Sequence, residues 1–307
     1  MSTLTEAEVI SKIQEGQSLS EAELSHINLE NTNLDQADFS GAYLRSANLK
    51  NASLRQANLS QATLVFAILS HASLIKTNLT NANLISANLA HANCREAFLK
   101  SAKLRGGNLY CTEFALADLT AGDFHEATVI QTNFSQADLA NTDFQSANCC
   151  QANFSSAKLL QANFAKANLS ETNLLEAYLD KANFTRANIQ NSDFTKASLV
   201  AANFPTASLI STNFTEAELS QANLEAAILQ KVNLTKTSLF AANLESARLM
   251  EVNLTGTNLQ DANLENTFWD RVDFSDCNVR GATFTDAQGL TPPQKTLLRE
   301  NGALNVP

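Results

Sequence analysis

The sequence predicts an all-β solenoid, in which the chain winds repeatedly around a narrow apolar core. Three observations predict this fold: a five-residue repeat along most of the 307 residues, an apolar content of 44%, and only nine glycines. Leu or Phe occupies nearly every position whose number ends in 4 or 9 from Leu24 to Phe284, and a small residue stands two positions earlier. An unbroken short period of this kind is typical of a repeat architecture.

The five-residue period excludes both regular elements. On an α-helix, at about 100° per residue, successive central residues move around the helix and form no apolar stripe. On one continuous strand, side chains alternate in direction, so every second central residue would face water. A short extended side followed by a corner returns each central residue to the inside, so we expect the chain to coil around an axis.

The two inward positions of the repeat share a narrow interior, which explains why the first of them is small. Of 53 central positions, 34 are Leu and 13 are Phe. Phe recurs every ten residues in the middle of the chain, at Phe114, Phe124, Phe134, Phe144, Phe154, Phe164, Phe184, Phe194, Phe204 and Phe214. A coil of four sides and twenty residues places these rings on two opposite sides, so we expect four repeats per coil.

The two ends of the repeat need caps, because an open solenoid end exposes unpaired backbone and apolar core. Thr5 with Glu8 three residues later is a capping box, so residues 1–18 are predicted to form an N-terminal capping helix. Residues 19–288 are predicted to form the repeat. Residues 289–307 are predicted to form a C-terminal capping helix and tail, with Pro292 near the helix start and Leu297, Leu298 and Leu304 covering the last coil.

The repeat reads Ala-Asn-Leu-x-x, as in Ala47-Asn48-Leu49 and, with Phe, Ala152-Asn153-Phe154. Tandem repeats of this form resemble the pentapeptide-repeat protein family. The resemblance implies a right-handed quadrilateral β-helix, here of about 13 coils, with short α-helical caps. Some relatives protect DNA gyrase from quinolones or inhibit it as acidic mimics of DNA, which implies a possible topoisomerase partner. Their C-terminal ends also dimerise, so the resemblance leaves open a monomer or a dimer through the tail.

No catalytic motif is present in the sequence: there is no Gly-rich phosphate loop, no GxSxG and no HExxH. We therefore expect no enzymatic activity and no cofactor. His71, His91 and Cys111 are twenty residues apart and fall in one outward column, which makes them a weak candidate for a Zn²⁺ site. The favoured interpretation of these three residues is a column of solvated residues at the corners of the coil. The Asn before each central residue is interpreted as a turn residue, whose side chain bonds to nearby backbone groups and can form hydrogen-bonded columns along the coils.

The net charge of −10 argues against direct nucleic-acid binding through overall basicity. No apolar run approaches the roughly 18 residues of a membrane span, so no membrane association is expected. The N-terminus lacks the basic and apolar pattern of a secretory signal, and the five cysteines are scattered. These features favour a cytoplasmic protein.

Charge is unevenly distributed along the repeat. Residues 41–105 carry a basic zone with a net charge of +7, whose main members are Arg45, Arg55, Lys76, Arg95, Lys103 and Arg105. Residues 106–157 contain no Lys or Arg, and their acidic residues include Glu113, Asp118, Asp123, Asp138 and Asp143. In twenty-residue coils Asp118 stacks on Asp138, and Asp123 on Asp143. A solvated surface is the favoured explanation, and an acidic docking surface is the functional alternative.

The sequence therefore favours a non-catalytic scaffold that binds a protein partner and has a regulatory role. The alternative is an acidic DNA mimic that binds or protects a topoisomerase. Duplex DNA carries about one charge per 1.7 Å, so a repeat about 64 Å long would need nearly four times this net charge to match it. The repeat also lacks the interrupting loops of the topoisomerase-binding relatives, and both points weaken the alternative.

Overall fold

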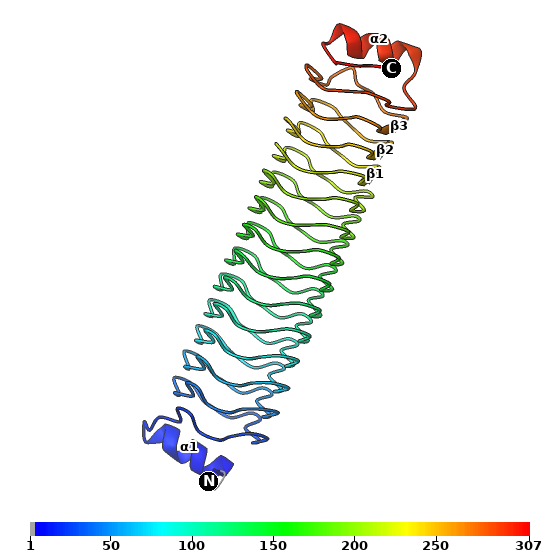
Figure 1. The fold of residues 1–307 in the computed structure, drawn as a ribbon. Helices are drawn as coiled ribbons and strands as arrows, with labels where there is room; N and C mark the ends of the chain where they lie inside the picture. Colours follow the sequence, from blue (N-terminus) through cyan, green and yellow to red (C-terminus); the bar gives the residue numbers. More distant parts are fainter. Residues whose placement is uncertain (1–3) are drawn as a thin grey trace. The chain divides into compact units, whose positions relative to one another are not determined.

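The computed structural model describes residues 4–307 and divides the chain into two compact units. Unit 1 is Met1–Ala157, of which residues 4–157 are described, and unit 2 is Lys158–Pro307. In each unit the chain winds in a regular series of stacked coils (Figure 1). Helix α1, Glu6–Gln14, precedes the coils of unit 1, and helix α2, Pro292–Glu300, follows those of unit 2.

Each coil contains twenty residues, as the Phe pattern predicts. Parallel bridges join residues twenty apart, for example Tyr43 to Thr63 in unit 1 and Asn203 to Asn223 in unit 2. Most of these contacts are single bridges. Within residues 4–307 only β1 (Ile228–Gln230), β2 (Arg248–Met250) and β3 (Phe268–Asp270) are long enough to be strands, and they form one parallel sheet in the order β1-β2-β3.

Most repeats end in a tight turn whose third residue is left-handed. At one such turn, the amide of Ala52 donates to the carbonyl of Leu49 at 3.0 Å, and Asn51 has φ 56°. A positive φ at the third residue is the mark of a type II turn, which usually takes glycine. Here the position is held mostly by Asn, Gln, Ser, Glu and Lys, and Thr206 is the only β-branched residue with positive φ among the described residues. This explains how the chain turns with so few glycines.

Left-handed backbone costs a non-glycine residue about 1–2 kcal/mol. The stacked coils offset this cost, because the amides of most left-handed residues donate to a carbonyl of the next coil. Asn51 donates to Ser70 at 3.0 Å, and Gln56 donates to Ile75 at 3.0 Å. The turn conformation is therefore stabilised by hydrogen bonds between coils.

The central residues form continuous columns inside each unit. Phe rings twenty residues apart stack, as Phe124 does on Phe144 with 4.5 Å between ring centroids. Rings ten residues apart meet edge to face, as Phe124 does with Phe134 at 6.0 Å and an interplanar angle of 86°. The side chains of the central positions from Leu24 to Phe284 are buried. The sequence prediction of Phe on two opposite sides of a four-sided coil is confirmed by this geometry.

The small inward position has a second role that its size alone does not explain. Several buried threonines there donate their hydroxyl to a backbone carbonyl 23 residues earlier, as Thr77 does to Leu54 at 2.6 Å and Thr132 to Leu109 at 2.6 Å. Every buried side-chain nitrogen or oxygen of the described residues has a hydrogen-bond partner. Threonine is therefore tolerated in the core because its polar group is satisfied there.

Asn before the central residue stabilises the corner, as expected. The Asn48 Oδ1 accepts from the Lys50 amide at 3.2 Å, two residues later, and its Nδ2 donates to the Asn28 Oδ1 of the preceding coil at 2.8 Å. Asn183 and Asn163 make the same contact in unit 2 at 3.0 Å. One side chain thus holds the local turn and the stacking of the coils.

Each terminal segment contains one helix, α1 within residues 4–18 and α2 within residues 289–307. Thr5 and Glu8 form the capping box of α1, and Thr291 precedes α2. After α2 the chain returns to the repeat, where Leu304 donates its amide to Ala282 at 2.8 Å. The side chain of Leu304 is 51% exposed, so Leu304 covers the last coil with its backbone and not with its side chain as predicted. In the described part of the chain, no helix has the length and apolar character that crossing a bilayer would require.

The left-handed turn position should discriminate sharply against β-branched residues. We expect Asn81→Val to lower the free energy of unfolding by about 1–2 kcal/mol, because Asn81 has φ 58°. Thr80→Val, one residue earlier in the same turn, should change it by less than about 0.5 kcal/mol. Urea unfolding of both variants provides the measurement, and equal losses would contradict the proposed origin of the turn preference.

Candidate functional site

Four of the predicted acidic residues stack in pairs in unit 1. Parallel bridges join Asp118 to Asp138 and Asp123 to Asp143, so each pair occupies equivalent positions on adjacent coils. Neighbouring strands in such a ladder are about 4.8 Å apart. The stacking predicted from the twenty-residue period is therefore present, and like charges lie next to each other in two columns.

The acidic residues do not form one flat surface. The columns of Asp118 and Asp123 lie on neighbouring sides of the coil, separated by the turn at residues 119–122. Glu113 lies on the side before them, where its Oε2 accepts from the Nδ2 of Asn133 at 2.8 Å. The five residues therefore extend over three successive sides of unit 1.

Each Asp performs the same local task as the Asn of an ordinary repeat. The Oδ1 atom accepts from the backbone amide two residues later: Thr120 for Asp118 at 3.0 Å and His125 for Asp123 at 3.0 Å. The same bond is made by Asp138 to Ala140 at 3.2 Å and by Asp143 to Gln145 at 3.0 Å. Because an amide oxygen makes this bond equally well in other coils, the fold does not require the negative charge.

The basic zone is dispersed over several sides, and one part of it meets the acidic residues. Lys103 is bridged to Asp123, and the Arg105 Nε lies 3.4 Å from the Asp123 Oδ2. Lys76 is ion-paired with Glu96 at 3.3 Å.

The remaining basic residues occupy the turn position directly after the central residue. Arg45 and Arg105 stand in one such column, three coils apart, with Val65 and Ile85 between them. Arg55 and Arg95 stand in a second column, two coils apart. The basic zone is thus a set of separate columns and not a continuous patch.

Exposed apolar side chains lie beside these charges, and sequence reasoning missed them. Phe98 is 51% exposed and is bridged to Asp118, and Leu116 is 46% exposed in the turn just before Asp118. On another part of unit 1, Phe66 is 51% exposed and the Arg45 guanidinium lies over its ring at 5.8 Å. The signal was available, because these apolar residues stand at outward positions of the repeat where Asn, Gln or Ser is usual.

The weak metal candidate forms a column without a metal geometry. The rings of His71 and His91 stack at 4.8 Å with an interplanar angle of 10°, and the Cys111 thiol donates to the Gln131 side chain at 3.3 Å. Parallel stacked rings direct their nitrogens side by side and not toward a common point. From residue 4 to the C-terminus, no group of three or more His, Cys, Asp or Glu is placed to hold a metal ion.

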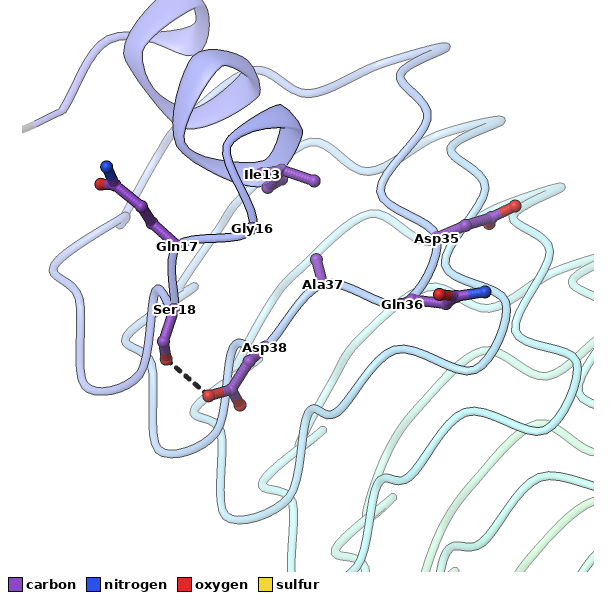
Figure 2. Close-up of a pocket in the computed structure, with 8 residues that line it drawn as sticks. All are labelled: Ile13, Gly16, Gln17, Ser18, Asp35, Gln36, Ala37 and Asp38. Carbon is purple, nitrogen blue, oxygen red and sulfur yellow. Dashed lines mark hydrogen bonds between the residues drawn. The ribbon is translucent and has the colours of Figure 1, made fainter.

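A cleft of about 430 Å³ lies beside α1 (Figure 2). Its lining residues are Ile13, Gly16, Gln17, Ser18, Asp35, Gln36, Ala37 and Asp38. The cleft lies between residues 35–38 of the first coils and the segment formed by α1 and the loop after it, which stands in place of a regular repeat.

Both carboxylates of the cleft are engaged within the protein. The Asp35 Oδ1 accepts from the Ser53 hydroxyl and the Arg55 amide, and Asp38 accepts from the Ser18 hydroxyl and the Ser40 amide. The bond from Ser18 is the main reason that the pKa of Asp38 lies below its usual value. A lowered pKa keeps this carboxyl ionised and unsuited to act as a general acid at neutral pH.

Two family models match the chain. The model of pentapeptide repeats matches the chain over the ranges 22–61, 67–106, 82–120, 99–136, 217–256 and 253–288. The model of a pentapeptide repeat region matches residues 147–224. These matches cover well over half of the sequence, so the chain belongs to the pentapeptide-repeat family. Proteins of this family form right-handed β-helices and are generally non-enzymatic structural or interaction proteins.

Solved structures similar to this chain include other pentapeptide-repeat proteins. HetL from the cyanobacterium Nostoc sp. strain PCC 7120, described as involved in heterocyst differentiation regulation, is 22% identical, with 92% of this chain and 97% of HetL covered and a TM-score of 0.19. A trypsin-treated variant of QnrB1, a plasmid-mediated fluoroquinolone resistance protein, is 17% identical, with 60% and 94% covered and a TM-score of 0.37. A thylakoid-lumen protein of Arabidopsis thaliana is 25% identical, with 46% and 81% covered and a TM-score of 0.25. No curated protein is similar enough in sequence to count as a match.

The hydrogen bond from Ser18 can be tested through the titration of Asp38. We expect Ser18→Ala to raise the pKa of Asp38 toward the ordinary aspartate value, because the main cause of its lowering is removed. Carboxyl ¹³C NMR titration measures this shift. Ser20→Ala is the matched control, since the Ser20 hydroxyl donates to the Ser40 carbonyl and not to Asp38.

The sign of the linked stability effect follows from the lowered pKa. The contribution of Asp38 to stability is present above the pKa of an unfolded aspartate, about 3.9, and is lost as the pH falls through the lower folded value. The destabilisation caused by Ser18→Ala should therefore fade on acidification across that window. An unchanged Asp38 pKa in Ser18→Ala would contradict this assignment.

Proposed function

We propose that the protein is a non-catalytic, regulatory scaffold that binds a protein partner through an acidic docking surface in unit 1. The surface consists of Glu113, Asp118, Asp123, Asp138 and Asp143. One observation carries the proposal: carboxylates are stacked in two columns at positions where Asn supplies the same backbone hydrogen bonds without a charge. The charge is therefore not required for the turn hydrogen bonds, and Asp123 also pairs with Arg105 within the chain.

Stacked like charges lower the stability of the coil, because carboxylates on adjacent coils repel each other. Other columns of the chain avoid this repulsion by placing opposite charges on adjacent coils. In unit 2, Lys236 lies 3.7 Å from Glu216, and Arg271 lies 2.6 Å from Glu251. A basic partner would relieve the repulsion in the Asp columns, which supports binding as their role.

The surroundings of the Asp columns indicate the chemistry of the partner. Phe98 and Leu116 expose apolar surface next to Asp118, so a partner would bury apolar side chains as well as pair charges. Interfaces that combine a buried aromatic residue with flanking charges gain affinity from the first and specificity from the second. We infer a partner surface with Lys or Arg around an apolar contact.

We further propose that residues 19–288 form a right-handed quadrilateral β-helix of about 13 coils, capped by residues 1–18 and 289–307. The buried side chains of Val9 in α1 and Leu298 in α2 support this division. So does the bond from the Gln294 side chain of α2 to the Val272 carbonyl at 2.6 Å. Each helix would then shield apolar core at one end of the repeat.

The capping role of α2 predicts a local cost for removing its buried side chain. We expect Leu298→Ala to lower the free energy of unfolding by about 2–4 kcal/mol, the usual cost of emptying a buried leucine site. Leu304→Ala is the control, because its side chain is half exposed and its backbone bonds remain, and it should cost less than about 1 kcal/mol. Urea unfolding measures both, and a silent Leu298→Ala would contradict a capping role.

The docking surface is tested by removing its charges while keeping its hydrogen bonds. We expect the variant with Asp118, Asp123, Asp138 and Asp143 all changed to Asn to lose partners that the native chain recovers from a lysate of the source cells. The fold should persist, because Asn makes the same turn bonds elsewhere in the chain. Quantitative pull-down measures the loss.

The matched control is Asp193→Asn in unit 2, where Asp193 has the same position and accepts from the Thr195 amide at 3.0 Å. It should retain every partner. If the fourfold Asn variant also retains every partner, the acidic docking surface is wrong. The alternative of a topoisomerase-directed DNA mimic is separated by a gyrase supercoiling assay with and without quinolone, in which only such a mimic changes the reaction.

A further inference from the structure

One side of unit 2 carries similar three-residue corners on consecutive coils. Thr follows Asn by two residues at 213–215, 233–235 and 253–255, and Asp193 with Thr195 stands in the same columns one coil earlier. In each corner the Thr hydroxyl donates to the side-chain oxygen of its own Asn or Asp. These bonds run from Thr195 to Asp193 at 2.5 Å, Thr215 to Asn213 at 2.7 Å, Thr235 to Asn233 at 2.6 Å and Thr255 to Asn253 at 2.7 Å.

The side-chain amides join these corners from coil to coil. The Nδ2 atom of each Asn donates to the Thr hydroxyl oxygen of the preceding coil, from Asn213 to Thr195 at 2.8 Å, Asn233 to Thr215 at 2.9 Å and Asn253 to Thr235 at 3.1 Å. Because each of these Thr oxygens accepts from the next coil and donates within its own, the seven bonds form one continuous chain. We call its members the Asn-Thr relay: Asp193, Thr195, Asn213, Thr215, Asn233, Thr235, Asn253 and Thr255.

Every bond of the Asn-Thr relay has the same direction, from Thr255 toward Asp193. The turns fix this direction, because the Oδ1 atom of each Asn also accepts from the backbone amide two residues later. The Thr215 amide donates to Asn213 at 3.1 Å, and the Thr235 amide donates to Asn233 at 3.1 Å. Turning an Asn side-chain amide over would place its NH₂ group against this backbone N–H, so the turns exclude a chain that runs the other way.

An aspartate ends the Asn-Thr relay on each side. Asp193 accepts but has no side-chain hydrogen to pass on, and Leu175 stands before Thr195 in the Thr column. At the other end Asp273 takes the place of a further Asn, and its carboxylate has no N–H group to donate to Thr255. The Asp273 carboxylate instead accepts from the amide and the hydroxyl of Ser275, both at 2.9 Å. The relay therefore runs from a neutral hydroxyl to a single carboxylate.

We propose that the Asn-Thr relay is a coupling device that ties together corners three coils apart. Hydrogen bonds strengthen one another when each group donates and accepts at once, and bonds to an ionised acceptor are the strongest. Asp193 provides that acceptor, since its Oδ1 atom accepts from the Thr195 amide and hydroxyl and from the Asn213 Nδ2 at 3.1 Å. Its charge polarises the bonds behind it over about 14 Å, at the strand spacing of a β-ladder.

The Asn-Thr relay gives Asp193 a role other than docking. Asp118 and Asp138 repel each other in their column, whereas Asp193 is followed in its column by Asn213, which donates to it. The relay uses bonds within unit 2 alone, so it goes beyond the partner binding proposed for unit 1. A local change at Thr255 is felt at Asp193, and this side of unit 2 responds as one unit.

An equivalent corner outside the relay provides the control. Thr185 donates to Asn183 at 2.6 Å and, like Thr215, is half-buried. Ala165 and Pro205 occupy its position on the coils before and after, so no hydroxyl continues the chain on either side. Thr185 thus makes the same bond within its corner without belonging to a chain of hydroxyls.

A double-mutant cycle with the full chain tests the coupling. Thr215→Val and Thr255→Val each remove one hydroxyl with little change in shape, and Val200 occupies an equivalent turn position in unit 2. In urea unfolding, each single variant should raise the unfolding equilibrium constant roughly two- to tenfold. The double variant should fall at least about threefold short of the product of the two, because the first cut has already weakened the second link. Thr185→Val with Thr215→Val should give the full product.

NMR of the side-chain amides gives a readout that a loss of packing would not produce. Asp193→Asn keeps an oxygen acceptor but removes the charge. We expect the Asn253 side-chain amide protons to move upfield in this variant, because their bond to Thr235 weakens. Glu245→Gln is the control, since it removes a carboxylate that lies outside the relay and less than one coil from Asn253. Its effect on the same protons should be smaller.

The coupling is wrong if the relay pair is as additive as the control pair, or if the Asn253 protons move no further in Asp193→Asn than in Glu245→Gln. A control pair that deviates as much as the relay pair would also overturn it, because the effect would then be general. The NMR comparison decides the question if a Val variant does not fold. Asp193→Asn should keep its lysate partners in either case, so this inference and the proposed function fail separately.

Discussion

The whole structure depends on the hydrogen-bond register between successive coils. A left-handed turn residue would be strained alone, but the amides of most of them donate to a carbonyl of the next coil, as Asn51 does to Ser70. The same register places Phe124 on Phe144 inside and Asn48 beside Asn28 outside. One insertion within a repeat would shift all three columns at once. The strict five-residue period in the sequence is therefore a consequence of backbone bonding between coils.

The inside of the fold could be predicted from the sequence because each inward position has a single requirement. From Leu24 to Phe284, the size and apolar character of a residue are enough to assign it to an inward position. The Phe period of ten then indicated that each coil has four sides. The turn geometry was not predicted, since a left-handed residue usually signals glycine and this chain uses residues such as Asn51 and Lys76. The backbone pairing of Leu304 with the last coil was not predicted, because a single bridged residue leaves no periodic pattern in the sequence.

The candidate surfaces were only half predictable. The twenty-residue period correctly stacked Asp118 on Asp138, because residues in one column have fixed neighbours along the coil. The same period places Phe98 directly before Asp118 in that column, although the sequence prediction overlooked it. Only the relation between Leu116 and Asp118 runs across columns. Which residues are neighbours across a turn depends on the angle of that turn, and the repeat period does not give this angle. Outward aromatic residues were the overlooked signal.

The outward positions are where such a fold can acquire a function. Inward positions and turns are constrained by packing and by the register, whereas the residue before the centre needs only a side-chain oxygen near the next amide. Asn meets that need without charge, as Asn58 does for Ser60. Asp meets it equally but adds a charge that repels its neighbour in the column. A repeat that accepts this cost at Asp118 and Asp138, beside exposed Phe98, is therefore the surface that we propose for partner binding, because the fold alone does not require those charges.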